Sequence, residues 1–164
     1  MRHGEAEGSG AGSDAARALT PSGISDCRGL AEKLAGDGAA WDAILCSSAR
    51  RARESAECMA GSMAAAPALD IRDTLNLAGT YTLLAALRGL PDEVGSVLLV
   101  AHNPGVHALV LMLAAGGGGR AARRAARDFP PGALARLAFD GEGWARLAPG
   151  GADLREYLTP RDTL

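Results

Sequence analysis

The spacing of apolar positions along this chain of 164 residues predicts helices that alternate with short buried strands. Between residues 22 and 34, apolar side chains recur every three or four positions, which is typical of an amphipathic helix. The runs Ala43–Cys46 and Ser96–Ala101 are almost continuously apolar, as expected of strands in a parallel sheet that helices cover on both faces. Further helices are predicted from about Ala49 to Met63, from Tyr81 to Leu90, and from Asn103, as N-cap, to about Ala115.

Weaker patterns complete the order of elements. Residues 69–71 are expected to form a short strand, and Arg120–Arg127 is helical by residue propensity. Residues 134–139 and 144–147 flank the turn sequence Asp140-Gly141-Glu142-Gly143 and are expected to pair as a hairpin. Because helix and strand alternate without an internal repeat or a long linker, we expect one α/β domain over residues 1–164.

Composition narrows the classes of function. The formal net charge of −2 provides no basic field for nucleic acid or an anionic membrane, and the longest apolar run, Ala108–Ala115, is too short to span a bilayer. The three cysteines, Cys27, Cys46 and Cys58, lack the spacing of a zinc site, so we expect reduced thiols packed as apolar groups, and no metal. No apolar signal region follows the first residues, and we expect a soluble, cytoplasmic protein.

Three polar clusters stand where strands are expected to end. The first is Arg2-His3-Gly4-Glu5, the second is Ser47–Ala52 and the third is His102–Gly105. Because ligands of open α/β sheets bind beyond the carboxyl ends of the strands, we expect the clusters to share one pocket. Their residue types suit phosphate chemistry, in which one neutral imidazole attacks phosphorus while a second imidazole and arginines neutralise the charge on the phosphoryl oxygens.

With two further segments, these clusters resemble the histidine phosphatase superfamily, which has the phosphoglycerate-mutase-like fold, and within it the small SixA-type phosphohistidine phosphatases. The matching motifs are Arg2-His3-Gly4-Glu5-Ala6, Leu19-Thr20-Pro21-x-Gly23, Ser47-x-x-x-Arg51-Ala52-x-x-Ser55-Ala56, Val100-x-His102-Asn103-Pro104-Gly105 and Thr159-Pro160-Arg161. The resemblance covers almost the whole chain and implies a three-layer sandwich, with a mostly parallel central sheet and helices on both faces.

The resemblance also implies roles for the matching residues. His3 is the expected nucleophile, His102 the second histidine, and Arg2 and Arg51 contact the phosphoryl group. Arg51 is preferred to Arg50 because the family places this arginine four residues after the serine and directly before alanine. The expected substrate-binding residues are Arg2, Gly4, Arg51, His102 and Asn103, and no cofactor is implied.

The chain departs from the family in two places. The family has a buried strand before Arg-His-Gly, but only Met1 stands there, so the N-terminal strand is apparently truncated. Since unpaired buried backbone is costly, we expect either an incomplete chain with its true start upstream or a poorly held nucleophile loop. Second, no Asp or Glu lies between Thr74 and Pro91, where other members carry an acid for the leaving group, and Glu5 and Asp73 are the nearest substitutes.

A missing acid favours a leaving group that needs little help, such as the imidazole of phosphohistidine. We therefore expect a phosphatase that forms a covalent phosphohistidine and acts on a phosphorylated protein, such as a histidine-containing phosphotransfer domain. The alternatives are a broad phosphomonoesterase of small phosphorylated molecules and an inactive phosphate-binding module. Outside the motifs, His107 and Arg53 are expected to be structural or exposed. The stripe Arg120, Arg123, Arg124 and Arg127 is expected to be a solvated face or else a docking patch for an acidic protein.

Overall fold

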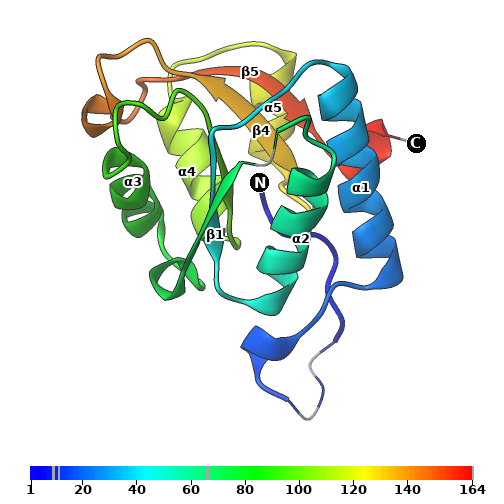
Figure 1. Ribbon diagram of the computed structural model, residues 1–164. Coiled ribbons are helices and arrows are strands. Elements are labelled where there is room, and N and C mark those ends of the chain that lie inside the picture. The colour runs from blue at the N-terminus through cyan, green and yellow to red at the C-terminus, as the bar shows by residue number, and fades with distance from the viewer. Residues whose placement is uncertain (9, 11, 66, 164) are drawn as a thin grey trace.

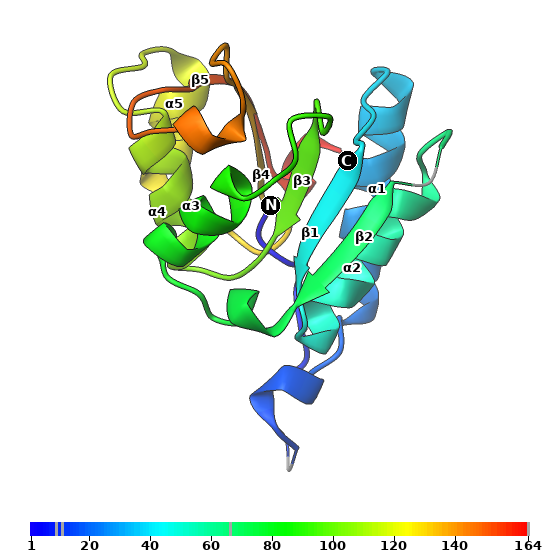
Figure 2. The ribbon, with the colours of Figure 1, turned by 60° about the vertical axis from the view of Figure 1, so that its left-hand side comes forward.

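A parallel sheet forms the centre of the computed structural model, which describes residues 1–8, 10, 12–65 and 67–163. Its strands are β1 (Ala43–Ser47), β2 (Ala68–Arg72) and β3 (Val97–Val100), in the order β2-β1-β3. Cys46 pairs with Ile71 on one side and with Val100 on the other. Every residue of β1 is buried, as the apolar run predicted. The carboxyl ends of β1 and β3 therefore lie side by side at one edge of the sheet (Figure 2).

The first residues of the chain extend this sheet beyond β3. The Ala101 N–H donates to the Met1 carbonyl at 3.1 Å, and the His3 N–H donates to the Ala101 carbonyl at 3.1 Å. On the other side, the Arg2 N–H donates to the Ala133 carbonyl at 2.9 Å, directly before β4 (Leu134–Ala138). The loop that carries His3 is thus hydrogen-bonded on both sides, and the expectation that it is poorly held is wrong.

Met1 also borders a cleft between the two sheets. The cleft has a volume of about 770 Å³ and is lined by side chains of both β3 and β4, among them Leu98 and Leu137. The N-terminal amine is buried here and donates to the Leu99 carbonyl at 2.7 Å. Burial lowers the pKa of this amine to about 5, so it is a neutral donor at neutral pH.

A second, antiparallel sheet corrects the predicted hairpin. β4 pairs with β5 (Asp153–Leu158), with Leu134 opposite Leu158 and an irregularity between Arg136 and Leu137. Residues 144–146, predicted to be the second strand, form a 3-10 helix instead. Leu147 of this segment is buried in the core, and the Trp144 indole donates to the Val94 carbonyl. The turn was placed correctly, but the partner strand lies further along the chain.

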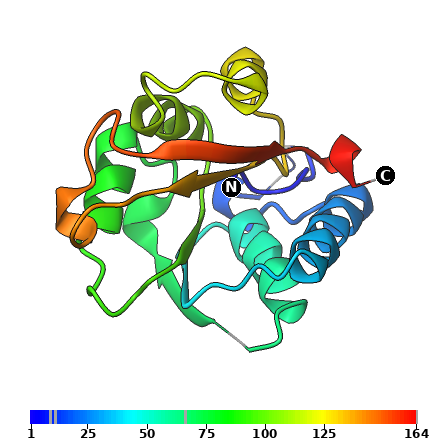
Figure 3. The same ribbon diagram turned by 90° about the horizontal axis from the view of Figure 1, so that it is seen from above.

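Helices cover both faces of the central sheet, and this confirms the predicted three-layer α/β fold (Figures 1 and 2). One face carries α1 (Pro21–Gly36) and α2 (Arg50–Gly61), and the other carries α3 (Thr80–Arg88), α4 (Gly105–Leu113) and α5 (Arg120–Arg127). The core is divided in the same way, because one apolar cluster includes residues of α1 and α2 and the other residues of α3 and α4. Seen from above, α4 and α5 lie next to each other on the same side of β5 (Figure 3).

The start of α4 differs from the predicted N-cap at Asn103. The helix begins at Gly105, the Asn103–Pro104 peptide bond is cis, and the Asn103 side chain donates to the Phe129 carbonyl at 2.9 Å. A Cβ at Gly105 would lie 2.1 Å from the Ala78 carbonyl oxygen, so only glycine fits there. Asn103 therefore joins α4 to the loop after α5.

No helix in the described part of the chain is long and apolar enough to span a membrane.

Candidate active site

The loop that carries His3 packs against α1 and α2. The Gly4 N–H donates to Ser55 Oγ at 2.9 Å, and that hydroxyl donates to the Arg51 carbonyl at 2.7 Å. A Cβ at Gly4 would lie 2.8 Å from Cys27 Sγ, so the glycine allows this close approach. The His3 ring is oriented by its Nδ1–H, which donates to the Gly4 carbonyl at 2.7 Å. Because a carbonyl only accepts, the proton of the neutral ring is assigned to Nδ1, and Nε2 keeps a free electron pair.

His102 faces His3 from the end of β3. The ring centroids are 5.0 Å apart, and the ring planes are inclined by 58°. His102 Nε2 lies 2.7 Å from Ser47 Oγ, at the end of β1, and Nδ1 lies 3.3 Å from the Nη2 group of Arg51. Since a guanidinium only donates, the proton of the neutral His102 ring is assigned to Nε2, which donates to the serine. Two residues separated by almost a hundred positions thus form one site.

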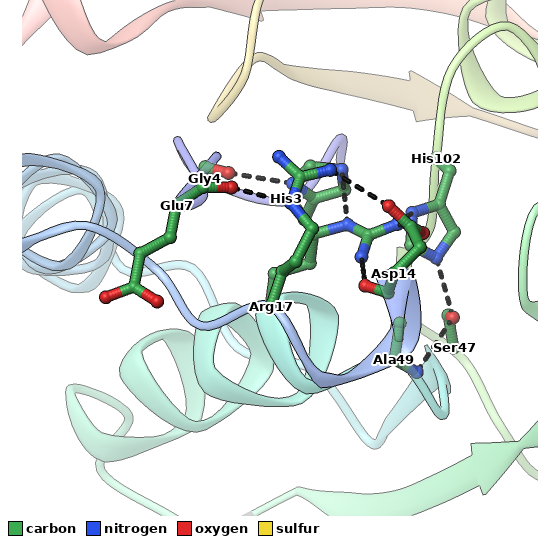
Figure 4. A network of polar contacts seen from close by, with 9 residues as sticks. His3, Gly4, Glu7, Asp14, Arg17, Ser47, Ala49 and His102 are labelled. Carbon is green, nitrogen blue, oxygen red and sulfur yellow. Dashed lines mark hydrogen bonds and ion pairs between the residues drawn. The ribbon is translucent and has the colours of Figure 1, made fainter. Parts of the chain in front are cut away.

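Arg51 lies between the two imidazoles. It comes from the first turn of α2, and only 3% of its side chain is exposed. Its Nε–H points at His3 Nε2 at 3.3 Å, while its Nη2 group contacts His102 (Figure 4). The neighbouring Arg50 instead forms an exposed ion pair with Glu54 at 2.7 Å, away from the imidazoles. The structure therefore brings Arg51, and not Arg50, to the two histidines.

Arg2 and Asn103 are linked through one backbone carbonyl group. The Nη1 group of Arg2 and the side-chain amide of Asn103 both donate to the Phe129 carbonyl, at 3.0 and 2.9 Å. Among the described residues, Arg2 Nε and Asn103 Oδ1 are buried atoms without a hydrogen-bond partner. An unpaired buried donor is costly, and a bound anion would satisfy Arg2 Nε.

The electrostatics of the site keep both imidazoles neutral. The pKa of His3 is lowered to about 4, first by burial and then by the positive charges of Arg51, Arg2 and Arg17, against the opposing hydrogen bond to the Gly4 carbonyl. Burial also lowers the pKa of His102 to about 4, with contributions from His3 and Arg51. Two neutral rings beside fixed guanidinium groups favour an anion at this position and offer it an unprotonated nitrogen.

Asp14 belongs to this network, although the sequence analysis missed it. The residue begins a short 3-10 helix, and its main-chain carbonyl and Oδ2 accept from Arg51 at 2.6 and 2.8 Å. Its Oδ1 accepts from Arg17 at 2.9 Å, and the hydrogen bonds from Arg17 and Arg51 lower the pKa of the carboxyl (Figure 4). The only signal in the sequence is the Asp14/Arg17 pair, three residues apart, just before the Leu19-Thr20-Pro21 motif.

Several other predicted candidates lie outside the network. The Glu5 carboxylate accepts from the Thr20 hydroxyl at 2.9 Å, and within the described residues no hydrogen bond joins Glu5 or Asp73 to either histidine. His107 Nε2 bonds to the Ala125 carbonyl at 2.7 Å, and its ring stacks on Phe129. His107 is therefore structural, as expected, and Arg53 is exposed.

The cysteines and the acidic residues offer no alternative chemistry in the region that the structure covers. Burial raises the pKa of the Cys27 thiol to about 11 and that of the Cys46 thiol to about 12, so both remain protonated. In residues 1–8, 10, 12–65 and 67–163, no group of three or more His, Cys, Asp or Glu side chains is arranged to hold a metal ion. The unprotonated side-chain nitrogens of the two facing histidines are therefore the groups considered below.

Comparison with known proteins agrees with this geometry. Residues 1–76 match the histidine phosphatase superfamily (branch 1). The uncharacterized protein Rv1276c of Mycobacterium tuberculosis is 33% identical over 163 residues, which cover 98% of this chain and 100% of that protein. The chain belongs to the histidine phosphatase superfamily, and it is a phosphatase of that class.

Among solved structures, this chain is similar to SixA proteins of the superfamily. A protein of Nakamurella multipartitia named as the phosphohistidine phosphatase SixA superposes with a TM-score of 0.85 at 30% identity, covering 98% of this chain and 93% of that one. The protein histidine phosphatase SixA complexed with tungstate superposes with a TM-score of 0.80 at 26% identity, covering 100% and 97%. The fold is thus similar to that of SixA proteins over almost the whole chain.

Proposed function

We propose that this phosphatase removes the phosphoryl group from protein phosphohistidine, through a covalent phosphohistidine on His3. The observation that carries the proposal is the unprotonated Nε2 of His3, 3.3 Å from the Nε–H of the buried Arg51. A phosphoryl group that replaces this hydrogen bond would be attacked by Nε2 while its oxygens accept hydrogen bonds from the guanidinium. The similarity to SixA, which binds the tetrahedral anion tungstate, supports a phosphoryl group in this position.

The first half of the reaction transfers the phosphoryl group to the enzyme. The Nε2 electron pair of His3 forms the new N–P bond, while the N–P bond of the substrate breaks and its electrons return to the leaving imidazole. His3 becomes positively charged, and the Gly4 carbonyl stabilises that charge by accepting from Nδ1–H at 2.7 Å. We assign the three phosphoryl oxygens to Arg51, to the unpaired Nε–H of Arg2 and to the nearby His102.

The second half releases phosphate. A water oxygen bonds to phosphorus, the N–P bond to His3 breaks, and its electrons return to Nε2, which restores the neutral ring. The water protons leave with inorganic phosphate and the solvent. Nδ1 keeps its proton throughout, since its bond to the Gly4 carbonyl is the same before and after the reaction.

The carboxylates of the site support a nitrogen leaving group over an alkoxide. Asp14 is the carboxylate bonded to Arg51, and its pKa is lowered by hydrogen bonds from Arg17 and Arg51, so it is ionised at neutral pH and cannot donate a proton. An alkoxide needs such a proton, whereas the imidazole of an N-protonated phosphohistidine leaves as a neutral ring. The polar groups at hand therefore favour a phosphoramidate over a sugar ester.

Two measurements test the proposal. We expect acid-labile ³²P to be trapped on the wild type and on His107→Ala, the control outside the site, but not on His3→Ala, whose kcat/KM should fall at least about a thousandfold. In a substrate panel, a phosphohistidine protein should be turned over with a higher kcat/KM than aryl or sugar phosphates. Clear preference for a sugar ester, or label that survives in His3→Ala, would refute the proposal.

A further inference from the structure

Helix α5 carries a concentration of positive charge that the reaction at His3 does not use. Four of its eight residues are arginine and none is acidic, although the chain as a whole has a formal net charge of −2. The arginines stand at helical positions i, i+3, i+4 and i+7, which places them on one side of the helix. Like charges at this spacing destabilise a helix, so the stripe is unfavourable for folding. The four arginines are Arg120, Arg123, Arg124 and Arg127.

The structure separates one of these arginines from the other three. Arg124 donates to both carboxylate oxygens of Asp162, at 2.9 and 2.7 Å, and its guanidinium lies 5.4 Å from the centroid of the Tyr157 ring. It therefore anchors α5 to β5 and to the C-terminal turn. Arg120, Arg123 and Arg127 are exposed, and no hydrogen bond or ion pair joins their side chains to the rest of the described chain. Three cations are thus displayed to solvent on an anchored helix.

Helix α5 also lies next in sequence to the residue that binds Arg2 and Asn103. Its last residue, Arg127, stands two positions before Phe129, whose carbonyl accepts from both Arg2 and Asn103. His107 Nε2 bonds to the Ala125 carbonyl, which fixes α5 against α4, the helix that follows His102. Seven residue steps separate Arg120 from Arg127, or roughly 10 Å along the helix axis. No small phosphate bound at His3 spans that length together with the site, whereas a protein surface does.

We propose that Arg120, Arg123 and Arg127 form a docking face for an acidic surface on the protein that carries the phosphohistidine. The proposal rests on the function proposed above and deepens it by naming the kind of partner. Charge complementarity at the edge of an interface mainly accelerates encounter and makes association sensitive to salt. The docking face would therefore act on kcat/KM for a protein substrate and leave the chemical step unchanged.

The test compares two triple variants on two substrates. Arg120→Ala/Arg123→Ala/Arg127→Ala removes the docking face, and Arg28→Ala/Arg53→Ala/Arg146→Ala removes three exposed arginines from other elements as a control matched in charge. The substrates are an acidic histidine-containing phosphotransfer domain, phosphorylated on its histidine, and phosphoramidate. At low salt we expect the first variant to lose about tenfold in kcat/KM on the protein, with phosphoramidate turnover unchanged within twofold and the control variant like the wild type on both.

A second readout uses the wild type alone, so the result does not depend on the folding of a variant. Added sodium chloride should lower kcat/KM for the protein substrate far more than for phosphoramidate. Equal losses in both triple variants, or equal salt dependence of both substrates, would overturn the docking face and leave the proposed function standing. If the wild type does not dephosphorylate the protein at all while it hydrolyses other phosphates, the proposed function fails, and the docking face fails with it.

Discussion

Asp14 is expected to compete with the phosphoryl group for Arg51, and replacing it should strengthen anion binding. In the free site its Oδ2 accepts from the Arg51 Nη2 group at 2.8 Å, and the arginine is only 3% exposed. If that guanidinium group binds phosphoryl oxygens, as we propose, a bound anion has to displace the carboxylate or accept its repulsion. Asp14→Asn removes the charge and keeps an oxygen in place, so the cost of displacement falls.

The size of the effect follows from the exposure of the pair. Half of the Asp14 side chain is exposed, so solvent screens the interaction, and a value of about 0.5–1 kcal/mol is appropriate. This corresponds to roughly two- to fivefold tighter binding of the anion. Isothermal titration with tungstate or inorganic phosphate at pH 7 measures the Kd directly.

A matched control is Asp37→Asn, which removes an exposed carboxylate paired with Lys33 at 3.0 Å on α1 and should leave the Kd unchanged. The carboxylate of Asp14 also stabilises the fold, because its pKa is lowered in the folded chain. That contribution is present above the ordinary pKa of an aspartate and is lost as the pH falls through the lowered value. Unchanged or weaker anion binding by Asp14→Asn would show that the carboxylate stays in place and assists the anion, which refutes the competition.

Three further outcomes are expected. Ser47→Ala removes the partner of His102 Nε2 at 2.7 Å and should cost about 1–3 kcal/mol in urea unfolding and about tenfold in kcat/KM; a fully active variant would contradict this. Because burial lowers the pKa of His3 and His102 from 6.5 to about 4, the unfolded chain binds more protons between these values. Stability should therefore fall on acidification from pH 6.5 to pH 4, while kcat/KM shows no break near 6.5; a break there disproves the lowered values. Gly4→Ala places a Cβ 2.8 Å from a sulfur atom and should destabilise by about 1–3 kcal/mol, whereas Gly36→Ala, which meets open space, should not; equal melting temperatures would argue against the close packing.

The parts of the fold that local pattern controls could be predicted from the sequence. β1 and β3 are short apolar runs followed directly by polar residues, so both the strands and the positions of Ser47 and His102 at their ends were accessible. The second sheet was not, because the turn after β4 is a local signal, whereas the choice of β5 as its partner depends on how Trp144 and Leu147 pack.

The same distinction holds within the candidate site. His3, Arg51 and His102 lie in recognisable motifs, and the structure brings all three together. Asp14 has no motif of its own, and its contact with Arg51 spans 37 positions. The Asn103 amide was predicted as a helix cap from local preference, but it bonds to the Phe129 carbonyl, 26 positions away. Side chains that serve a distant backbone group leave little trace in a single sequence.

The close packing at Gly105 has a consequence for attempts to change the specificity of this site. Any Cβ at this position would lie 2.1 Å from the Ala78 carbonyl oxygen. Libraries that randomise residues 102–105 would therefore lose most of their members at position 105 to misfolding. Screens for new substrates should keep this glycine and vary its neighbours.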